Sequence, residues 1–97
     1  MTIKLSNAND EQRIQIFKAL ADESRLQILR VLKESGRELS CGEVGEKCML
    51  HKATASYHFK TLREAGLTIT RKDSTTKYVK LNLETFQEYL PSFLETL

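Results

Sequence analysis

The amino-acid sequence predicts a mainly α-helical protein that carries one small β-hairpin, in the order α-α-α-α-β-β-α. Two observations predict this fold class. Apolar residues recur at helical spacing in four successive segments before Gly66, and the period then falls to two residues over the stretch 67–81. A chain of 97 residues has room for one such domain, and its core is small enough that a second copy covering further apolar surface is expected.

The first two helices are predicted at residues 10–21 and 22–36. Asp22 suits the N-cap position of the second of them, and Gly36 offers its C-terminal stop. This second helix is apolar around much of its circumference, which is typical of a helix at the centre of a fold. The apolar residues of the first helix recur at helical spacing: Ile14, Phe17, Leu20 and Ala21.

The third and fourth helices form a predicted helix-turn-helix over about residues 40–65. Ser40 opens the third helix, and Glu43 follows three residues later, which is the spacing of a capping box. After a break at residues 49–51, a longer helix runs to the end of this range. Two helices joined by a turn of about three residues are typical of the helix-turn-helix motif.

A hairpin and a last helix complete the chain. The hairpin, or wing, is predicted over about residues 67–82 with a polar tip at residues 73–76, and a short strand is expected at residues 38–40. The last helix starts near Asn82 and is interrupted by Pro91. Alternation sets three side chains on one face of the first strand and two on one face of the second: Leu67, Ile69 and Arg71, and Val79 and Leu81.

The whole chain, residues 1–97, is therefore predicted to be a single winged helix-turn-helix domain. Its net charge of +2 is unevenly spread, because residues 47–83 hold 8 Lys or Arg against 2 Asp or Glu, a balance of +6. Such a concentration of positive charge is expected where a protein meets a polyanion such as DNA. A basic face that only contacts water is the alternative, and charge alone does not decide between the two.

The fourth helix carries the residues that are expected to contact DNA. In KATASYHFKTLREAGL, residues 52–67, the buried stripe is formed by Ala55, Phe59 and Leu62. Hydroxyl and basic side chains gather away from this stripe: Lys52, Thr54, Ser56, Tyr57 and Lys60. A helix in the major groove touches base edges with its first turns, where hydroxyls can donate and accept hydrogen bonds and lysines can reach phosphates or guanine. A surface helix that merely faces water does not explain hydroxyls gathered at one end.

Three stretches match the motifs of a known family. The family's second-helix signature is matched by FKALADESRLQILRVL, its recognition helix by TASYHFKTLREAGL and its wing by TRKDSTTKYVKLN. The chain thus resembles the ArsR/SmtB family of bacterial winged-helix transcriptional repressors. The resemblance implies a homodimer, joined mainly through the helices at about 10–21 and 83–97, that represses transcription at a double-stranded operator until an unidentified inducer releases it. It also implies DNA contacts by residues of the recognition helix and the wing: Lys52, Thr54, Ser56, Tyr57, Arg71, Lys72 and Lys77.

The ligands of the metal-sensing members are missing. Many relatives bind metals through a Cys-x-Cys pair in the third helix, where this chain has a lone Cys41 between Ser40 and Gly42. The last helix contains neither His nor Asp, so no metal and no cofactor are expected. The chain also departs from the family at Tyr57, where many members carry His, and at the wing tip, which lacks the usual glycine.

Two cysteines, Cys41 and Cys48, are candidate thiol sensors. Cys41 is expected in the first turn of the third helix, where the helix dipole would lower its pKa while two nearby glutamates oppose that shift. The alternative is that both cysteines fill the core. Cys48, His51 and His58 could also be proposed as a metal set, but a core residue, a turn residue and a structural histidine are the commoner roles.

Other classes of protein receive little support. The sequence shows no catalytic Ser/His/Asp or Cys/His set, no glycine-rich phosphate loop and no paired carboxylates, so no enzyme is indicated. The start, MTIKLSNANDEQ, lacks a signal-peptide pattern, and no run approaches the roughly 18 apolar residues of a membrane span, so a cytoplasmic protein is expected. The alternative to a DNA-binding regulator is a winged helix that only binds other proteins, and the basic balance of residues 47–83 argues against it.

Overall fold

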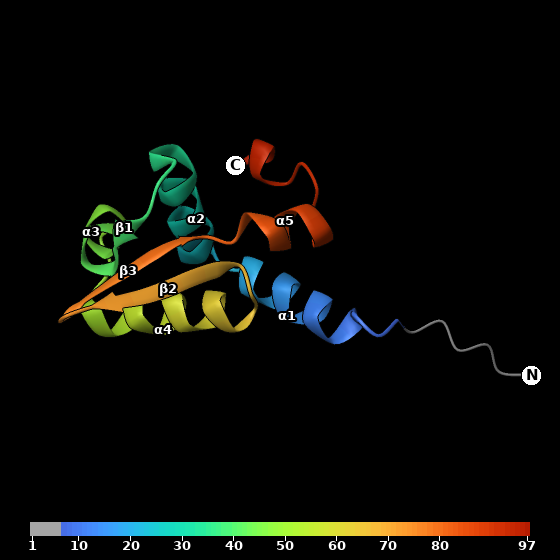
Figure 1. Cartoon of the computed structure of the whole chain (residues 1–97), viewed down its shortest axis with the longest axis horizontal. Helices are drawn as coiled ribbons and strands as arrows, with labels where there is room; N and C mark the ends of the chain where they lie inside the picture. Colours follow the sequence, from blue (N-terminus) through green and yellow to red (C-terminus); the bar gives the residue numbers. More distant parts are fainter. Residues whose placement is uncertain (1–6) are drawn as a thin grey trace, which may run out of the picture.

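The structure, a computed structural model, describes residues 7–97 and confirms the predicted order of elements (Figure 1). Along the chain lie α1 (Asp10–Leu20), α2 (Glu23–Ser35), β1 (Leu39–Ser40), α3 (Cys41–Lys47), α4 (Lys52–Glu64), β2 (Thr68–Asp73), β3 (Thr76–Leu81), α5 (Leu83–Tyr89) and a 3-10 turn (Leu94–Thr96). The first six residues, in which no signal peptide is expected, lie outside the described part. Of the helices described, none has the length and apolarity that crossing a membrane requires.

Two predicted N-caps are confirmed. Asp22 Oδ1 accepts a hydrogen bond from the backbone N–H of Arg25 at 3.1 Å, and Ser40 Oγ accepts one from the N–H of Glu43 at 3.1 Å. The hydrogen bond from the Arg25 backbone also lowers the pKa of the Asp22 carboxyl, because it favours the charged form. Local signals in the sequence therefore place the starts of α2 and α3 correctly.

The three strands form an antiparallel sheet in the order β1-β3-β2. The expected short strand before α3 is present, with Leu39 opposite Val79 and Ser40 opposite Tyr78. Because β3 lies in the middle, it joins the wing to the segment that leads into α3. The wing is thus fixed to the helix-turn-helix by backbone pairing.

The expectation that Ile69 shares a face with Leu67 is wrong. Ile69 is 43% exposed, whereas Leu67 is fully buried in the connection that precedes β2. Thr68 lies opposite Leu81 and is 3% exposed, so it takes the inward position. Residues paired directly across a sheet share a face, and the buried face of β3 contains Val79 and Leu81. The register with β3 therefore decides which face of β2 is buried.

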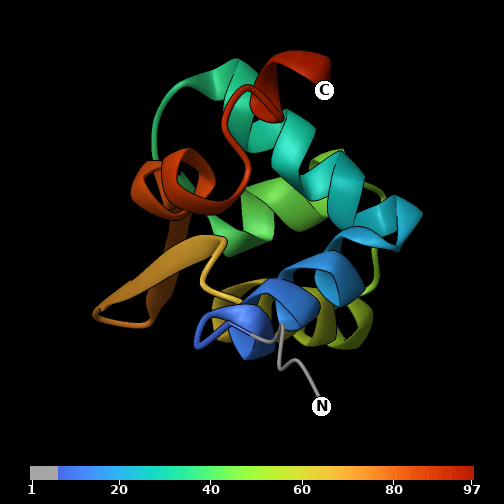
Figure 2. The same cartoon turned by 90° about the vertical axis from the view of Figure 1, so that its right-hand side faces the viewer.

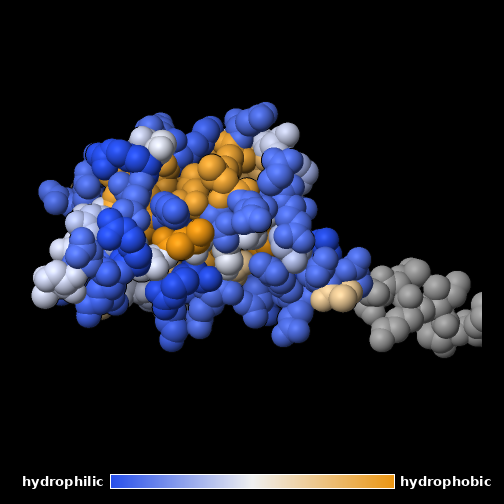
Figure 3. Space-filling view, viewed as in Figure 1, coloured by the Kyte–Doolittle hydropathy of each residue, from blue (hydrophilic) through white to orange (hydrophobic). Residues whose placement is uncertain are grey.

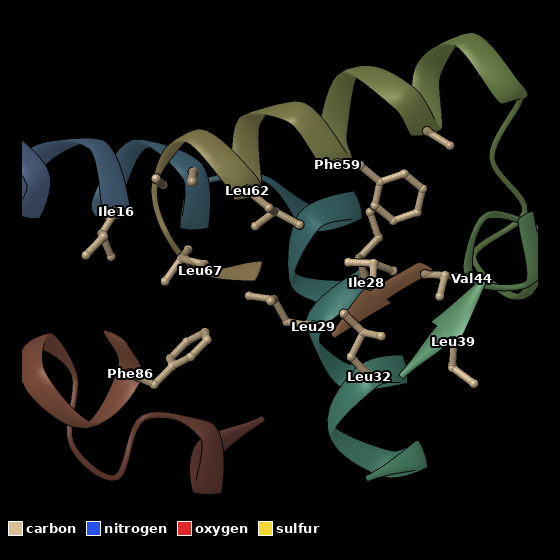
Figure 4. Close-up of a cluster of buried hydrophobic side chains, with 14 residues drawn as sticks. Ile16, Ile28, Leu29, Leu32, Leu39, Val44, Phe59, Leu62, Leu67 and Phe86 are labelled. Atoms are coloured by element: carbon tan, nitrogen blue, oxygen red, sulfur yellow. The ribbon is translucent and has the colours of Figure 1, made fainter. Parts of the chain in front are cut away.

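α2 lies at the centre of the core, as its apolar circumference predicts. Figure 4 shows Leu29 of α2 among side chains from several elements, with Phe59 and Leu62 of α4 on one side and Phe86 of α5 on another. Ile16 of α1 belongs to the same buried cluster. The buried cluster thus joins α4 to α1, α2, α3 and α5.

α1 packs through a different side from the predicted one. Its buried residues are Ile16 and Ala19, while Ile14 and Phe17 are 53% and 55% exposed. α1 contacts both α2 and α4, and Figure 2 shows it lying across α4 with α2 above. Because those contacts use the Ile16 side, the apolar pair Ile14 and Phe17 stays uncovered in the single chain.

The last helix ends where it was predicted to be interrupted. α5 stops at Tyr89, two residues before Pro91, and the chain folds back so that Phe93 stacks on Phe86 with ring centroids 6.3 Å apart. Tyr89 Oη donates a hydrogen bond to Gln12 Oε1 at 2.9 Å. This bond ties α5 to α1, although the two helices are distant in sequence.

Candidate nucleic-acid interface

The turn between α3 and α4 sets the start of α4. The N–H of Leu50 donates to the carbonyl of Gly45 at 2.9 Å, and the N–H of Met49 donates to the carbonyl of Glu46 at 3.0 Å. These two bonds make a Schellman motif, in which glycine usually occupies the position held here by Met49. Met49 has a φ of 56° and its side chain is 91% exposed. The α3 helix therefore ends in a tight turn, so α4 can begin a few residues later.

α4 has the buried and exposed sides that its sequence predicts. Ala55, Phe59 and Leu62 are buried, together with His58. The predicted DNA-contact residues of this helix are all exposed: Lys52, Thr54, Ser56, Tyr57 and Lys60. His51, at the N-cap, makes no side-chain capping bond, so no side chain caps the first N–H groups of α4 from that position. The exposed side chains and the uncapped N–H groups at the start of α4 can therefore hydrogen-bond to phosphates and base edges.

The wing tip carries two lysines side by side. Lys72 lies directly opposite Lys77 across the hairpin, and both are exposed. Like charges in this position destabilise a hairpin. Within residues 7–97, neither lysine forms an ion pair. An anion at the tip would relieve this repulsion, so the pairing favours contact with a polyanion.

Arg71, the third predicted cation of the wing, already has partners inside the protein. Its Nε lies 3.0 Å from both carboxylate oxygens of Glu38, and its Nη2 lies 2.8 Å from Glu38 Oε1. The guanidinium also lies over the ring of Tyr78, 4.5 Å from the centroid. The hydrogen bonds with Glu38 raise the pKa of Arg71 above its ordinary value. Arg71 thus crosses the outer face of the sheet and holds the wing against the segment before α3.

Helix and wing residues meet along one groove. α3, α4 and the wing tip enclose a groove of about 770 Å³. Lys52 and Ser56 line it from α4, and Lys77 lines it from the wing. The other predicted contact residues lie outside this lining: Thr54, Tyr57, Lys60, Arg71 and Lys72. Residues that are 25 positions apart in sequence, Lys52 and Lys77, are thereby brought to one surface.

The two candidate thiol sensors are partly covered by the core. Both Cys41 and Cys48 are half-buried and pack against the core. Burial raises the pKa of each thiol; around Cys41 it outweighs the opposite influence of Lys77 and Arg63. The expected lowering of the Cys41 pKa is therefore wrong. Because the thiolate is the reactive form, a raised pKa reduces reactivity at neutral pH.

The histidines have separate surroundings. His51 is exposed at the start of α4, whereas His58 is 7% exposed and lies 3.1 Å from Arg25. Among residues 7–97, no three His, Cys, Asp or Glu side chains come together as a metal site. Sequence reasoning missed Arg25, a buried arginine on the central helix. The signal that could have found it is a charged residue in a helix that is apolar on most sides.

Comparison with known proteins identifies the class. A family model described as a helix-turn-helix domain matches residues 20–71. The uncharacterized HTH-type transcriptional regulator YceK of Bacillus subtilis (strain 168) is 72% identical over 97 residues, which are 100% of this chain and 95% of YceK. The transcriptional activator HlyU of Vibrio cholerae is 35% identical over 82 residues, which cover 84% of this chain and 74% of HlyU.

Solved structures share the fold. HlyU from Vibrio cholerae N16961 matches with a TM-score of 0.75 at 33% identity, covering 94% of this chain and 92% of HlyU. The homodimeric winged helix-turn-helix DNA-binding domain Mb0332 from Mycobacterium bovis, described as a possible ArsR-family transcriptional regulator, matches with a TM-score of 0.69 at 23% identity. That match covers 98% of this chain and 96% of Mb0332.

The fold and the exposed end of α4 define a winged helix-turn-helix DNA-binding protein. The chain belongs to the helix-turn-helix family of transcriptional regulators, and its fold is that of the ArsR-family regulators. The predicted class and fold are therefore confirmed.

Proposed function

We propose that the protein is a homodimeric repressor that binds a pseudo-palindromic operator through α4 and the wing. The observation that carries the proposal is the groove between them, into which Lys52, Ser56 and Lys77 project from two separate elements. The unrelieved pairing of Lys72 with Lys77 supports an anionic partner at the same end of the molecule.

In this proposal, the residues of α4 make two kinds of DNA contact. Thr54, Ser56 and Tyr57 present hydroxyls to base edges in the major groove, because they lie on the exposed side of the first turns. Lys52 and Lys60 contact phosphates, which fixes the register of the helix on the duplex. Backbone N–H groups at the start of α4 add a further phosphate contact.

The wing lies along the phosphate backbone. Lys72 and Lys77 make the direct contacts there, because both are exposed and free of ion pairs within the described residues. Arg71 supports them by anchoring the wing to Glu38, so it acts on DNA binding mainly through wing geometry.

The dimer interface lies on α1 and α5. Ile14, Phe17 and Leu83 are 53%, 55% and 63% exposed, and the hydrogen bond between Tyr89 and Gln12 holds the two helices together. Figure 3 shows a further apolar area over the region where α2, β3 and α5 lie in Figure 1. Apolar surface of this kind marks an interface. Mb0332, which shares the fold, is homodimeric, and this supports a dimer here.

Repression follows if the bound dimer occupies DNA that the transcription machinery needs, so the protein would act in the cytoplasm, where that DNA lies. Activation is the second candidate outcome, because the relative HlyU is a transcriptional activator. The position of the operator relative to the promoter separates the two. Neither outcome requires catalysis.

In this proposal Cys41 and Cys48 are core residues rather than thiol sensors. An equal effect of peroxide on the operator affinity of wild type and of Cys41→Ser would agree with that assignment.

Selection of duplexes from a random-sequence pool tests the proposal. The enriched duplex should hold two half-sites whose centres are about 34 Å apart, or a small multiple of that distance. Binding to it should weaken steeply as salt concentration rises, because phosphate contacts release counterions. A pool that yields no enriched sequence, together with binding that ignores salt, would favour a module that only binds proteins.

A further inference from the structure

A buried arginine joins three helices at a point that the DNA contacts do not use. Arg25 of α2 is 9% exposed. Its Nε donates to the carbonyl of Ala19 at 2.7 Å, and its Nη2 lies 3.3 Å from the carbonyl of Lys18, both in the last turn of α1. Its Nη1 lies 3.1 Å from Nδ1 of His58 in α4. One guanidinium therefore connects the end of α1 to the middle of the recognition helix.

The contact with Arg25 requires an acceptor atom on His58. A guanidinium has only N–H donors, so Nδ1 of His58 must accept the hydrogen bond. His58 is then neutral and carries its proton on Nε2. A protonated His58 would turn an N–H toward Arg25 and place two positive charges in contact at a buried site, where water screens them poorly.

Both ends of this contact reach functional surfaces. The His58 ring lies 5.5 Å from the ring of Tyr57, which is 62% exposed at the proposed major-groove side of α4. At the other end, Lys18 and Ala19 follow Phe17, a residue of the proposed dimer surface. The angle between the dimer helix and the recognition helix is thus held at this junction.

We propose that Arg25 and His58 are positioning residues that fix α4 relative to α1, and that protonation of His58 breaks this contact and weakens operator binding. In a dimer, the angle of each recognition helix sets the spacing of the two half-sites that it can reach. Loss of the contact therefore relaxes spacing discrimination and lowers affinity for the preferred operator. This inference rests on the proposed function.

The charged and titratable groups around His58 come from two helices. α2 contributes Arg25 and, at its start, Asp22, whose pKa is lowered by the backbone hydrogen bond from Arg25 and by the nearby charge of Arg25. α4 itself contributes Tyr57. α1 contributes backbone carbonyls to Arg25. Asp22 attracts both cations and so limits the repulsion, but it does not replace the hydrogen bond that protonation removes.

The chain provides a matched control for this proton. It contains 2 histidines, and the other one, His51, is exposed at the start of α4. Protonated His51 would add positive charge beside the DNA and strengthen binding, which is the opposite sign. Over pH 5.5–7.5 Asp22 stays ionised because its pKa is lowered, and the cysteine thiols stay protonated because theirs are raised.

The experiment compares wild type with His58→Asn, His58→Leu and His51→Asn. Asparagine keeps an acceptor near the place of Nδ1 but takes up no proton, whereas leucine removes the acceptor. Operator affinity is measured by fluorescence anisotropy from pH 7.5 to 5.5, with the duplex selected from the random pool and with versions that carry one extra base pair between half-sites. Circular dichroism at each pH monitors folding.

Wild type should lose affinity toward acid, with each of the two His58 side chains of the dimer contributing at most about tenfold per pH unit. His51→Asn should keep that loss, and His58→Asn should abolish it. His58→Leu should resemble acidified wild type at every pH, with weaker binding and a smaller penalty for the extra base pair. Equal acid sensitivity in wild type and His58→Asn, or acid loss that coincides with unfolding, would overturn the proposal.

A measurement without DNA separates this inference from the proposed function. In NMR titrations of His51→Asn without DNA, amide signals of residues 18–21 and of α4 should shift together, and they should stay in place when His58→Asn is added to that variant. Independent shifts of the two segments would overturn the coupling even if operator binding is found. Failure to select any duplex would overturn the proposed function and leave the NMR result to decide the coupling.

Discussion

Two exposed surfaces of this small domain have opposite chemistry: the start of α4 with the wing tip, which is the proposed DNA-facing end, and the outer side of α1. The first presents hydroxyls and lysines, among them Ser56, Lys72 and Lys77. The second presents Ile14 and Phe17, each more than half exposed. Both surfaces are unfavourable in the isolated chain, one through like-charge repulsion and the other through apolar contact with water.

The difference shows what each surface requires. Repulsion between Lys72 and Lys77 is relieved by an anion, whereas Ile14 and Phe17 are covered only by another apolar surface. A homodimer on DNA supplies both partners at once. Substitutions on one surface should therefore change one kind of binding first.

Replacing Phe17 by aspartate should have the largest effect. The side chain is 55% exposed in the single chain, so the fold should survive while the dimer surface gains a charge. A monomer engages one half-site at a time, and loss of the linked second site should weaken operator binding by about 100- to 10,000-fold. Sedimentation and fluorescence anisotropy measure the two changes.

Gln15→Asp, which adds the same charge to an exposed position of the same helix, is the matched control and should remain a dimer. A Phe17→Asp protein that stays dimeric and binds the operator like wild type would place the interface elsewhere.

Tyr57→Ala and Lys77→Ala should separate two kinds of DNA contact, with smaller effects. Loss of Tyr57, an exposed residue, should reduce discrimination between bases by about 1–3 kcal/mol if it contacts base edges as proposed. Loss of Lys77 should weaken binding to all sequences and lower the salt slope by about 1. Anisotropy titrations at several salt concentrations measure both. Lys33→Ala, on the exposed end of α2, should change neither, and unaltered discrimination in Tyr57→Ala would mean that another element reads the groove.

Much of this fold could be predicted because its signals are local. The caps at Asp22 and Ser40 and the break before Pro91 each depend on residues within a few positions. The buried stripe of α4 likewise follows from spacing along one helix. The predicted contact residues of α4 are therefore exposed as expected, although their contacts with DNA stay a prediction.

The features that were missed depend on partners distant in sequence. The inward side of β2 is set by pairing with β3, so the apolar Ile69 faces outward while Thr68 is buried. Arg71 has an acidic partner, Glu38, that lies 33 positions away. The contact between Arg25 and His58 has the same separation. Periodicity along a single segment contains no information about these pairings.

Replacing the Asp22 cap should lower the stability of the whole fold, without a specific effect on DNA binding or on the dimer surface. Asp22→Ala removes the acceptor for the Arg25 N–H and should lower the free energy of unfolding by about 1 kcal/mol at pH 7, whereas Asp22→Asn should retain most of it. Because the folded state lowers the pKa of Asp22, its charge stabilises the fold above the ordinary carboxyl pKa, and this contribution is lost as pH falls through the lowered value. Urea unfolding at pH 7 and pH 3 should therefore show the difference between wild type and Asp22→Ala shrinking in acid. A difference that grows in acid would contradict the sign of the shift.

Met49→Gly should have the smallest effect and tests whether an exposed apolar residue beside the DNA-facing end belongs to it. Met49 and Gly66 occupy matching positions in Schellman motifs after α3 and α4, with φ of 56° and 83°. Glycine at position 49 relieves the left-handed strain of about 1–2 kcal/mol but makes the unfolded chain more flexible, so stability should rise by roughly 0.5–1 kcal/mol. The reverse change, Gly66→Ala, should destabilise, because a Cβ there would also lie 2.9 Å from Gln12 Nε2. Urea unfolding measures both variants. If Met49→Gly gains stability and keeps operator affinity, the side chain serves neither surface; a gain in stability with a loss of affinity would instead make Met49 part of the DNA-facing end.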